Sequence, residues 1–300
     1  MADTFAGKAV PTDRSHTEVK KFPHRILGRT GVSVSVLGFG VAPLGISRAD
    51  AALFERTLHE AIDLGINYID VAPAYGDGEE KLGPVIKERR DEVFLVTKTL
   101  LREPRTQDEA LKQLNESLKK LQTDCVDLVH LHNVGNFTPE ESLGPNGGLK
   151  GLLQAKQEGL LRFIGISGHV KPLKFIPLLE TGEVDVVMPT LNFVDGHTYN
   201  FESKVLPLAR THKCGIVAMK VLGGPTGGLG AYNPPQPALL SGVHYTNAIR
   251  YALSIPEVAC AVIGLKDTNE LLQAVEAVTH FSPLSEVEQA ALEAEGKKLA

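Results

Sequence analysis

Four residues that can hold or transfer protons stand at, or just beyond, the ends of short apolar segments of this chain. Asp70 and Tyr75 follow one apolar segment, Lys98 ends the next, and His132 ends a third. Ionisable groups that end buried segments are costly unless they converge on one another or on a ligand. A carboxylate, a phenol, an ammonium and an imidazole in one place are the components of a proton-transfer site. The sequence therefore predicts a catalytic site built from these four residues.

Short apolar segments bounded by turn residues alternate with longer stretches of helical periodicity. Eight of the short segments predict β-strands, at residues 36–40, 68–72, 93–98, 126–132, 163–167, 184–190, 215–220 and 258–264. Several are apolar at consecutive positions, which is typical of parallel strands covered on both faces. We therefore expect a parallel sheet with helices between its strands.

Capping patterns indicate where three of the helices begin. Residues 47–50 (Ser-Arg-Ala-Asp) can cap a helix that Gly65 ends. Residues 106–109 and 285–288 both have the Ser/Thr-x-x-Glu pattern of a capping box, and the first is followed by a stripe of leucines. The second predicts an extra helix near the C-terminus.

Eight strands alternating with helices fit two architectures, a (β/α)8 barrel and a doubly wound open sheet. A barrel gathers reactive residues from several strands at its C-terminal rim, which is where the four residues above would lie. An open-sheet dinucleotide binder would carry Gly-x-Gly-x-x-Gly after its first strand, and residues 38–45 fit that pattern badly. We expect a single α/β domain over residues 24–300, a (β/α)8 TIM barrel. Residues 25–35 predict a β-hairpin that could plug its N-terminal end, and residues 1–23 predict a polar arm ahead of the fold.

Composition narrows the classes of partner and compartment. The chain of 300 residues can bury a full core, and its net charge of -5 argues against a nucleic-acid partner. No stretch reaches the roughly 18 apolar residues of a membrane span, and the first residues lack a secretion signal. Cys125, Cys214 and Cys260 are far apart in the sequence, without metal-ligand spacing. We expect them to be small buried side chains in a protein of the reducing cytoplasm, with no metal site.

Five short motifs follow one another along most of the chain. They lie at residues 27–31 (LGRTG), 70–83 (DVAPAYGDGEEKLG), 96–98 (VTK), 127–132 (DLVHLH) and 165–167 (GIS). Together they resemble the aldo-keto reductase family, from about residue 25 to the last helix. The second motif is the most specific, and the order of all five makes coincidence improbable.

The resemblance implies a catalytic tetrad that reduces a carbonyl with NAD(P)H. Tyr75 would donate the proton that the developing alkoxide needs. A free phenol, with a pKa of about 10, is a poor acid, and Lys98 would ease its proton release. Asp70 would hold Lys98 charged, and His132 could orient the carbonyl oxygen. His130 is expected to be an interior histidine whose hydrogen bonds are satisfied.

Members of this family bind the cofactor extended across the rim, and here the matching residues differ from the family pattern. Ser167 matches the family's serine, but Gly168 stands where the family has asparagine. Met188 lies at about the position of the family's glutamine, and Met219 lies at the position of its ring-stacking tyrosine. A methionine can cover a nicotinamide face by polarisable packing. Lys220 could meet the pyrophosphate or the substrate, or could simply end its strand.

The phosphate end of the cofactor is expected where the last predicted strand leads into a helix. Gly264, Lys266 and Asp267 would lie at this helix N-terminus, which is a suitable anion site. Lys266 could pair with a 2′-phosphate or be a solvated loop lysine, and Gln273 could compensate for an arginine of the family that is absent here. The remaining predicted cofactor contacts are Gly40, Val41 and Leu222. We expect NADPH, with NADH possible.

Two features bear on the substrate. The chain has no tryptophan, which argues against a flat aromatic clamp. Asn133, Asn136, Asn192, Asp195 and His197 near predicted strand ends would suit a hydroxylated compound, so a small polar or sugar-like carbonyl substrate is expected. A Gly- and Pro-rich stretch after the seventh strand suggests an irregular loop over the pocket. Two alternatives remain open: a non-reductive enzyme, such as an epimerase or lyase, and a cofactor-sensing binding protein.

Overall fold

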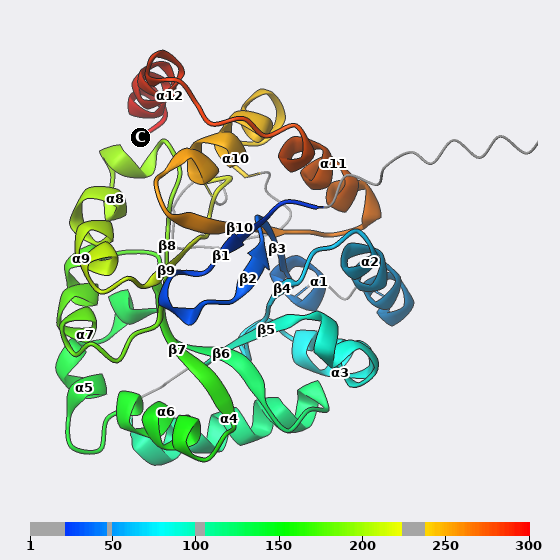
Figure 1. The fold of residues 1–300 in the computed structure, drawn as a ribbon, viewed down its shortest axis with the longest axis vertical. Coiled ribbons are helices and arrows are strands. Elements are labelled where there is room, and N and C mark those ends of the chain that lie inside the picture. Colours follow the sequence, from blue (N-terminus) through cyan, green and yellow to red (C-terminus); the bar gives the residue numbers. More distant parts are fainter. Residues whose placement is uncertain (1–21, 47–49, 100–105, 224–237) are drawn as a thin grey trace, which may run out of the picture.

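Eight parallel strands close into a barrel surrounded by helices (Figure 1). The computed structural model describes residues 22–46, 50–99, 106–223 and 238–300. The barrel strands are β3 (Leu37–Gly40), β4 (Tyr68–Asp70), β5 (Phe94–Thr99), β6 (Val126–His132), β7 (Leu161–Gly168), β8 (Val186–Pro189), β9 (Gly215–Ala218) and β10 (Val258–Gly264). They follow one another around the barrel in chain order, and β10 closes it against β3. The predicted (β/α)8 TIM barrel is confirmed.

The helices of the described residues cover the outside of this barrel. They are α1 (Ala42–Ile46), α2 (Ala51–Asp63), α3 (Gly78–Arg89), α4 (Gln107–Leu121), α5 (Pro139–Leu143), α6 (Gly148–Gln157), α7 (Ile176–Glu180), α8 (Phe201–Lys204), α9 (Leu206–Thr211), α10 (Tyr245–Ser254), α11 (Thr268–Thr279) and α12 (Glu286–Leu299). The last of them, α12, is the predicted extra C-terminal helix and lies at the edge of the molecule in Figure 1.

The predicted capping boxes are present at the starts of α4 and α12. The Thr106 hydroxyl accepts from the N–H of Glu109, and the Glu109 carboxylate accepts from the N–H of Thr106. Ser285 and Glu288 exchange the same two hydrogen bonds at the start of α12. Helix α2 is capped by the Asp50 carboxylate, which accepts from the N–H of Ala52. The predicted cap residue Ser47 lies outside the described residues. Such a cap is worth about 1 kcal/mol to its helix.

Three predicted strands end earlier than expected at the C-terminal rim. β4 ends at Asp70, β8 at Pro189 and β9 at Ala218. Proline has no N–H for a strand ladder, and Lys220 has a left-handed backbone with φ 53°. The residues just beyond these strands therefore belong to rim loops.

The predicted hairpin closes the other end of the barrel. β1 (His24–Ile26) pairs antiparallel with β2 (Ser33–Ser35), and the pair lies across the barrel opening in Figure 1. Leu27 and Val34 are fully buried and belong to the apolar cluster inside the barrel. The N–H of Arg29 donates to the carbonyl of Lys213, just before β9 (2.7 Å). Residues 1–21 of the predicted polar arm lie outside the described residues.

Every second residue of each strand points into the barrel. Paired residues of neighbouring parallel strands face the same side, so Lys98, His130 and Gly165 form one inward row. A Cβ added at Gly165 would lie 2.3 Å from Nδ1 of His130. The glycine therefore makes the space that the imidazole occupies.

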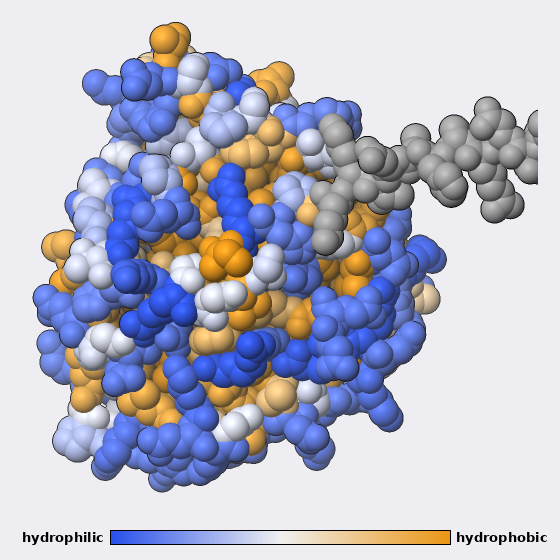
Figure 2. Space-filling view, in the orientation of Figure 1, coloured by the Kyte–Doolittle hydropathy of each residue, from blue (hydrophilic) through white to orange (hydrophobic). Residues whose placement is uncertain are grey.

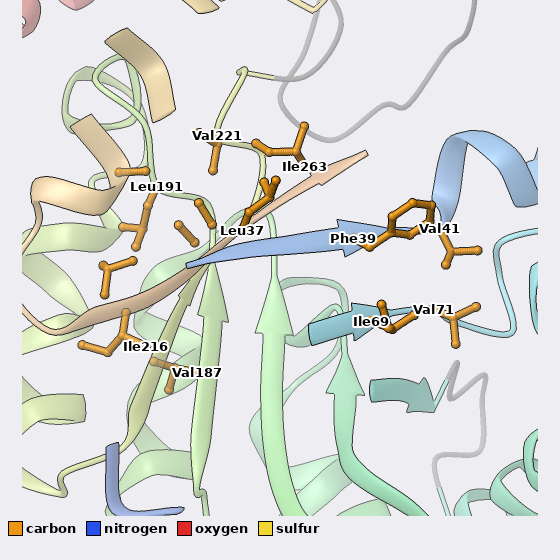
Figure 3. Packing of buried hydrophobic residues seen from close by; sticks show 14 of the residues in the cluster. Leu37, Phe39, Val41, Ile69, Val71, Val187, Leu191, Ile216, Val221 and Ile263 are labelled. Atoms are coloured by element: carbon orange, nitrogen blue, oxygen red, sulfur yellow. The ribbon is translucent and has the colours of Figure 1, made fainter. Parts of the chain in front are cut away.

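The alternate side chains point outward and pack beneath the helices. This outer cluster includes Leu37, Phe39, Ile69, Val187 and Ile216, all fully buried (Figure 3). Burial of both faces explains why the strands are continuous apolar runs in the sequence. It also fixes the register, because a slip of one residue would exchange inward and outward side chains.

Figure 2 shows the face of the molecule that carries the hairpin. Hydrophilic side chains dominate its periphery, and apolar ones are more frequent toward the middle. None of the helices in the described ranges combines the length and the apolar character that crossing a membrane requires.

The three cysteines are free thiols. Cys260 lies in the barrel interior, and the buried Cys214 thiol is 3.0 Å from the Val184 carbonyl to which it donates. Cys125 is only half-buried, contrary to expectation, because it precedes β6 at the surface. Within the described residues, no three or more His, Cys, Asp or Glu side chains gather as a metal ion would need.

Alanine at Gly28 or Gly31 tests how the hairpin is seated. Both glycines have positive φ, 48° and 69°, so an alanine at either costs about 1–2 kcal/mol from backbone conformation alone. At Gly28 the new Cβ would also lie 2.3 Å from the backbone nitrogen of Gly215, whereas nothing lies within 4 Å at Gly31. We expect Gly28→Ala to lower the free energy of unfolding in urea by about 2 kcal/mol more than Gly31→Ala. Equal losses would mean that the hairpin is not held against β9.

Candidate active site

The structure brings the four predicted tetrad residues to the same end of the barrel. The register pairs Lys98 of β5 with His130 of β6, and His132 ends β6 one inward layer higher. Asp70 ends β4, and Tyr75 follows in the loop before α3. Short strands ending at one rim therefore place these side chains within reach of one another.

Lys98 and Asp70 form a buried ion pair. Nζ of Lys98 lies 2.6 Å from Oδ1 of Asp70, and the two side chains are 1% and 4% exposed. The same Nζ donates to the carbonyl of Val71 (3.1 Å). Removing either charge from water without a partner costs several kcal/mol. Each group is therefore held in the barrel by the other.

Tyr75 lies beside this pair in the turn that leads into α3. Its N–H donates to the carbonyl of Ala72 (2.9 Å), and its carbonyl accepts from the N–H of Gly78 (3.0 Å). Nζ of Lys98 is 4.9 Å from the centroid of the phenol ring. The ring meets His132 edge to face, with centroids 6.4 Å apart. The phenol is thus flanked by an ammonium and an imidazole.

Electrostatics keep the phenol of Tyr75 protonated beside a fixed positive charge. Burial raises its pKa above the ordinary value, Lys98 opposes this by charge and hydrogen bond, and Asp70 adds to it. Burial lowers the pKa of Lys98, but the negative charges of Asp70 and of an ionised Tyr75 outweigh it, so that pKa is raised. Burial also raises the pKa of Asp70 against the pull of Lys98. At neutral pH the phenol therefore carries a proton and the lysine its charge.

His132 and His130 are neutral imidazoles. Burial lowers the pKa of both well below the ordinary value, and the charge of Lys98 lowers it further. His132 is thus a hydrogen-bonding group and not a proton source at neutral pH. His130 is fully buried in the interior, as expected, but the prediction that its hydrogen bonds are satisfied is wrong. Neither ring nitrogen has a hydrogen-bond partner of good geometry in the described part of the chain. The backbone of Ile166 raises the pKa of His130, but burial and Lys98 outweigh it.

Four side chains at or just beyond the C-terminal ends of β7, β8 and β9 lie at the barrel mouth beside His132. Ser167 pairs with Met188, and Thr190 pairs with Met219. Ser167 Oγ and Thr190 Oγ1 are buried and have no hydrogen-bond partner among the described residues. Buried hydroxyls normally have a hydrogen-bond partner, so these two can bond to a polar ligand at the mouth. Thr190 was not among the predicted site residues, although alternation from Met188 along the predicted strand assigns it to this face.

Four further predicted cofactor contacts could act mainly through their backbone. Gly40 and Gly168 end β3 and β7. The side chain of Val41 is fully buried in the outer cluster, and the half-buried Leu222 packs against that cluster. These positions can shape the mouth but supply no side-chain recognition.

At the predicted phosphate site, carboxylates from the start of α11 already bond to the N–H groups and the lysine that a phosphate would use. Asp267 caps the helix by accepting from two N–H groups of the first turn. Glu270 accepts from the N–H of Lys266 (2.9 Å) and pairs with its ammonium (2.7 Å). Gly264, Lys266 and Gln273 are exposed at this end. A 2′-phosphate at Lys266 would therefore compete with Glu270.

Lys220 and His169 extend the polar mouth beyond His132. The rings of His169 and His132 are 6.3 Å apart, and Nδ1 of His169 is buried without a partner in the described chain. Burial lowers the pKa of Lys220. Burial, followed by the charges of Lys220 and Lys98, lowers the pKa of His169 to about 3. His169 was not among the predicted site residues, because nothing in the local sequence distinguishes it from an ordinary loop residue.

The polar side chains after β8 form hydrogen bonds that stabilise the loop in which they lie. Asn192 Oδ1 accepts from the N–H of Asp195, and its Nδ2 donates to the carbonyl of Lys220 (2.9 Å). Asp195 Oδ2 accepts from the N–H of Phe201 (2.7 Å), and the His197 ring bonds to a backbone carbonyl of α12. These contacts speak against the prediction that these three side chains bind a hydroxylated substrate.

A closed (β/α)8 barrel that gathers ionisable side chains at its C-terminal rim is typical of barrel enzymes. Similarity to known proteins identifies the family. Residues 36–236 match the aldo/keto reductase family. The chain is 29% identical over 299 residues to L-galactose dehydrogenase of Arabidopsis thaliana, which covers 88% of this chain and 90% of that protein. It is 31% identical over 182 residues to a methylglyoxal reductase of Salmonella typhimurium, covering 60% and 65%.

Solved structures agree with this similarity. The holo form of an aldo-keto reductase from Bacillus halodurans is similar with a TM-score of 0.74 at 25% identity, covering 93% of this chain and 96% of that one. The chain belongs to the aldo/keto reductase family, whose members are oxidoreductases that typically use NAD(P)H.

Single and double substitutions of the buried pair test whether the two charges depend on each other. Lys98→Met leaves the Asp70 carboxylate buried without its cation and should lower the free energy of unfolding by about 3–5 kcal/mol. The double variant with Asp70→Asn carries neither charge and should lose much less. Urea unfolding of wild type, both single variants and the double variant gives the coupling energy. Additive losses would mean that the charges do not stabilise each other.

Proposed function

We propose that this chain reduces an aldehyde or ketone to an alcohol with NAD(P)H, and that Tyr75 donates the proton. The observation that carries the proposal is the position of the Tyr75 ring, 4.9 Å from the Lys98 ammonium and 6.4 Å from the His132 ring. With Asp70 bonded to Lys98, the arrangement matches the tetrad that the resemblance implies.

The tetrad residues divide the proton chemistry among themselves. When bound, the cofactor supplies a hydride to the carbonyl carbon. The Tyr75 hydroxyl donates its proton to the carbonyl oxygen as negative charge develops there. Lys98 stabilises the resulting phenolate by charge and hydrogen bond, and Asp70 holds Lys98 in place. The phenol then regains a proton from solvent.

The neutral state of His132 suits a positioning role. A protonated imidazole would compete with Tyr75 as the acid, and burial together with Lys98 prevents it. Its one N–H can donate to the carbonyl oxygen while the phenol approaches the same oxygen. The substrate carbonyl is then held by two donors, of which only Tyr75 gives up its proton.

The residues at the barrel mouth fit a nicotinamide. A carboxamide offers an acceptor and two donors, which the buried hydroxyls of Ser167 and Thr190 require. Met188 and Met219 are nearly fully buried and supply apolar, polarisable contacts for a ring face. Ser167 would keep the role of the family's serine, and Thr190, Met188 and Met219 would take the roles of its missing asparagine, glutamine and tyrosine.

We expect the substrate to be a small polar or sugar-like carbonyl compound. Two relatives are named for L-galactose and for methylglyoxal, which are small and polar. Another is named a 6-dehydroglucose reductase and is 31% identical over 165 residues. These names support a polar substrate for this chain without selecting one.

Tyr75→Phe tests the proton donor while keeping the ring. We expect kcat for aldehyde reduction, followed by the absorbance of NADPH, to fall by about 10²–10⁴-fold, because the acid is gone. Cofactor affinity, measured by fluorescence titration, should change little. Tyr199→Phe is the matched control, since this half-buried tyrosine packs near Phe201 and should leave kcat unchanged.

The outcomes separate the reductase from its alternatives. Full activity in Tyr75→Phe would remove the phenol from the mechanism. If wild type binds the cofactor but consumes none with any aldehyde, an epimerase, a lyase or a cofactor-sensing protein becomes the better proposal.

We further propose NADPH as the preferred cofactor, with Lys266 and Glu270 setting the preference. Lys266→Ala should weaken NADPH binding by roughly tenfold and leave NADH binding unchanged, because only NADPH carries the 2′-phosphate. Glu270→Gln should strengthen NADPH binding, since it removes the carboxylate that competes for Lys266. Fluorescence titration with both cofactors measures each effect.

Lys298→Ala serves as the control, because it breaks a comparable exposed ion pair with Glu295 on α12. Equal changes for NADPH and NADH would mean that Lys266 does not contact the 2′-phosphate.

A further inference from the structure

We propose that Glu79 is a positioning residue, whose hydrogen bond to β5 fixes the Tyr75 phenol beside Lys98. The most specific sequence motif, residues 70–83, continues beyond Tyr75 to this glutamate, and none of the proton-transfer steps uses it. This role rests on the proposed reductase function and adds a residue on which that function depends.

Glu79 lies in the first turn of α3 and is almost completely buried. The hydroxyl of Thr97 in β5 donates to its Oε1 over 2.8 Å, and the two residues are 2% and 1% exposed. Burial raises the pKa of Glu79. Hydrogen bonds from Ser117 and Thr97, and the charge of Lys120, lower it. The start of α3 is therefore linked to the barrel wall through Thr97 and to α4 through Ser117.

The bond joins the two segments that carry Tyr75 and Lys98. Thr97 comes directly before Lys98, and side chains alternate along a strand, so Thr97 points outward to α3 while Lys98 points into the barrel. On the helix side, the N–H of Gly78, the residue before Glu79, donates to the carbonyl of Tyr75 (3.0 Å). Loss of the bond would therefore change where the phenol lies relative to the ammonium.

The turn that carries Tyr75 packs closely against α1. The N–H of Asp77 donates to the carbonyl of Gly45 (3.3 Å). A Cβ added at Gly45 would lie 2.3 Å from the carbonyl oxygen of Tyr75, and one added at Gly76 would lie 2.3 Å from the carbonyl oxygen of Gly45. Contacts with α1 therefore hold the backbone of the turn, and the bond from Glu79 fixes the helix that follows it.

Stability alone does not call for a carboxyl group at this buried position. Replacing both partners of a buried hydrogen bond by apolar groups of the same shape can be nearly neutral. Apolar contacts are non-directional, whereas a hydrogen bond weakens when its distance or angle changes. The bond between Glu79 and Thr97 therefore selects one position of α3 on β5. A reaction that depends on the placement of the Tyr75 hydroxyl needs such a selection.

Variants on both sides of the bond test the proposal by kinetics. Glu79→Met and Thr97→Val each remove one partner and keep much of the side-chain volume. With NADPH and methylglyoxal, we expect either variant to lower kcat about tenfold or more, because the phenol is misplaced. The dissociation constant of NADPH should stay within about twofold. Glu79→Gln keeps an oxygen that accepts from Thr97 and should retain most of kcat.

Tyr251→Phe is the matched control. The Tyr251 hydroxyl also donates to a carboxylate, Glu202 Oε2 (3.2 Å), but this bond joins α10 to α8 outside the barrel. This variant should leave kcat unchanged. If Glu79→Met and Thr97→Val keep kcat within about threefold of wild type, or if Tyr251→Phe lowers it as much as they do, the proposal is wrong. Circular dichroism establishes which variants are folded, and Thr97→Val decides if Glu79→Met does not fold.

A double variant distinguishes positioning from a general structural effect. If Glu79 acts by placing the phenol, Glu79→Met should cause no further loss of kcat in a Tyr75→Phe protein, which has no phenol to place. A further loss as large as the one in wild type would mean that Glu79 supports the site as a whole, and would overturn the proposal.

A spectroscopic measurement separates this inference from the reductase function itself. Fluorotyrosine incorporated at all six tyrosines gives fluorine NMR signals, and Tyr75→Phe identifies the signal of Tyr75. That signal should shift in Glu79→Met and not in Tyr251→Phe. If it shifts in a protein that reduces no carbonyl compound, Glu79 still positions Tyr75 and the reductase proposal fails. If aldehydes are reduced while both the signal and kcat are unchanged in Glu79→Met, the reductase proposal stands and the positioning role is refuted.

Discussion

The buried ion pair between Lys98 and Asp70 is the constraint on which the rest of the site depends. Two charges can stay inside a barrel only when they are bonded to each other and their remaining hydrogen-bonding capacity is used, as the Val71 carbonyl does for Lys98. The charge held in this way acts on its neighbours. It lowers the pKa of His132 and His130, and it opposes the effect of burial on Tyr75. Burial, the largest cause of these shifts, and this pair together set the protonation states that the proposed chemistry requires.

The barrel separates the groups that stabilise it from those that react. The hairpin end is closed by Leu27 and Val34, which join the apolar layers of the lumen. Polar side chains begin at the row of Lys98 and His130 and continue to the rim. Burial of both strand faces fixes the register, so the polar rows cannot slip toward the closed end. The closed end can therefore be stabilised without disturbing the rim.

Sequence reasoning succeeded where the information is local. Apolar runs, turn residues and capping boxes predicted all eight barrel strands and the starts of α4 and α12, and β6 and β10 have the predicted bounds. It failed where the information is tertiary. Thr190 and His169 attract attention only because buried atoms lack partners, and the competition of Glu270 for Lys266 depends on how α11 begins. Asn192 looked like a substrate ligand until its loop contacts were visible.

A second lysine at the mouth, Lys220, raises the question of which charge keeps His132 neutral. Burial is the largest cause of the lowered pKa of His132 and Lys98 the second, while Lys220 acts less strongly than either. Loss of the Lys220 charge would therefore leave His132 neutral, and Tyr75 would remain the proposed acid. The Lys98 pair does not depend on Lys220 either, because Asp70 neutralises Lys98. The protonation states that the proposed chemistry needs are thus set inside the barrel and not by the loop after β9.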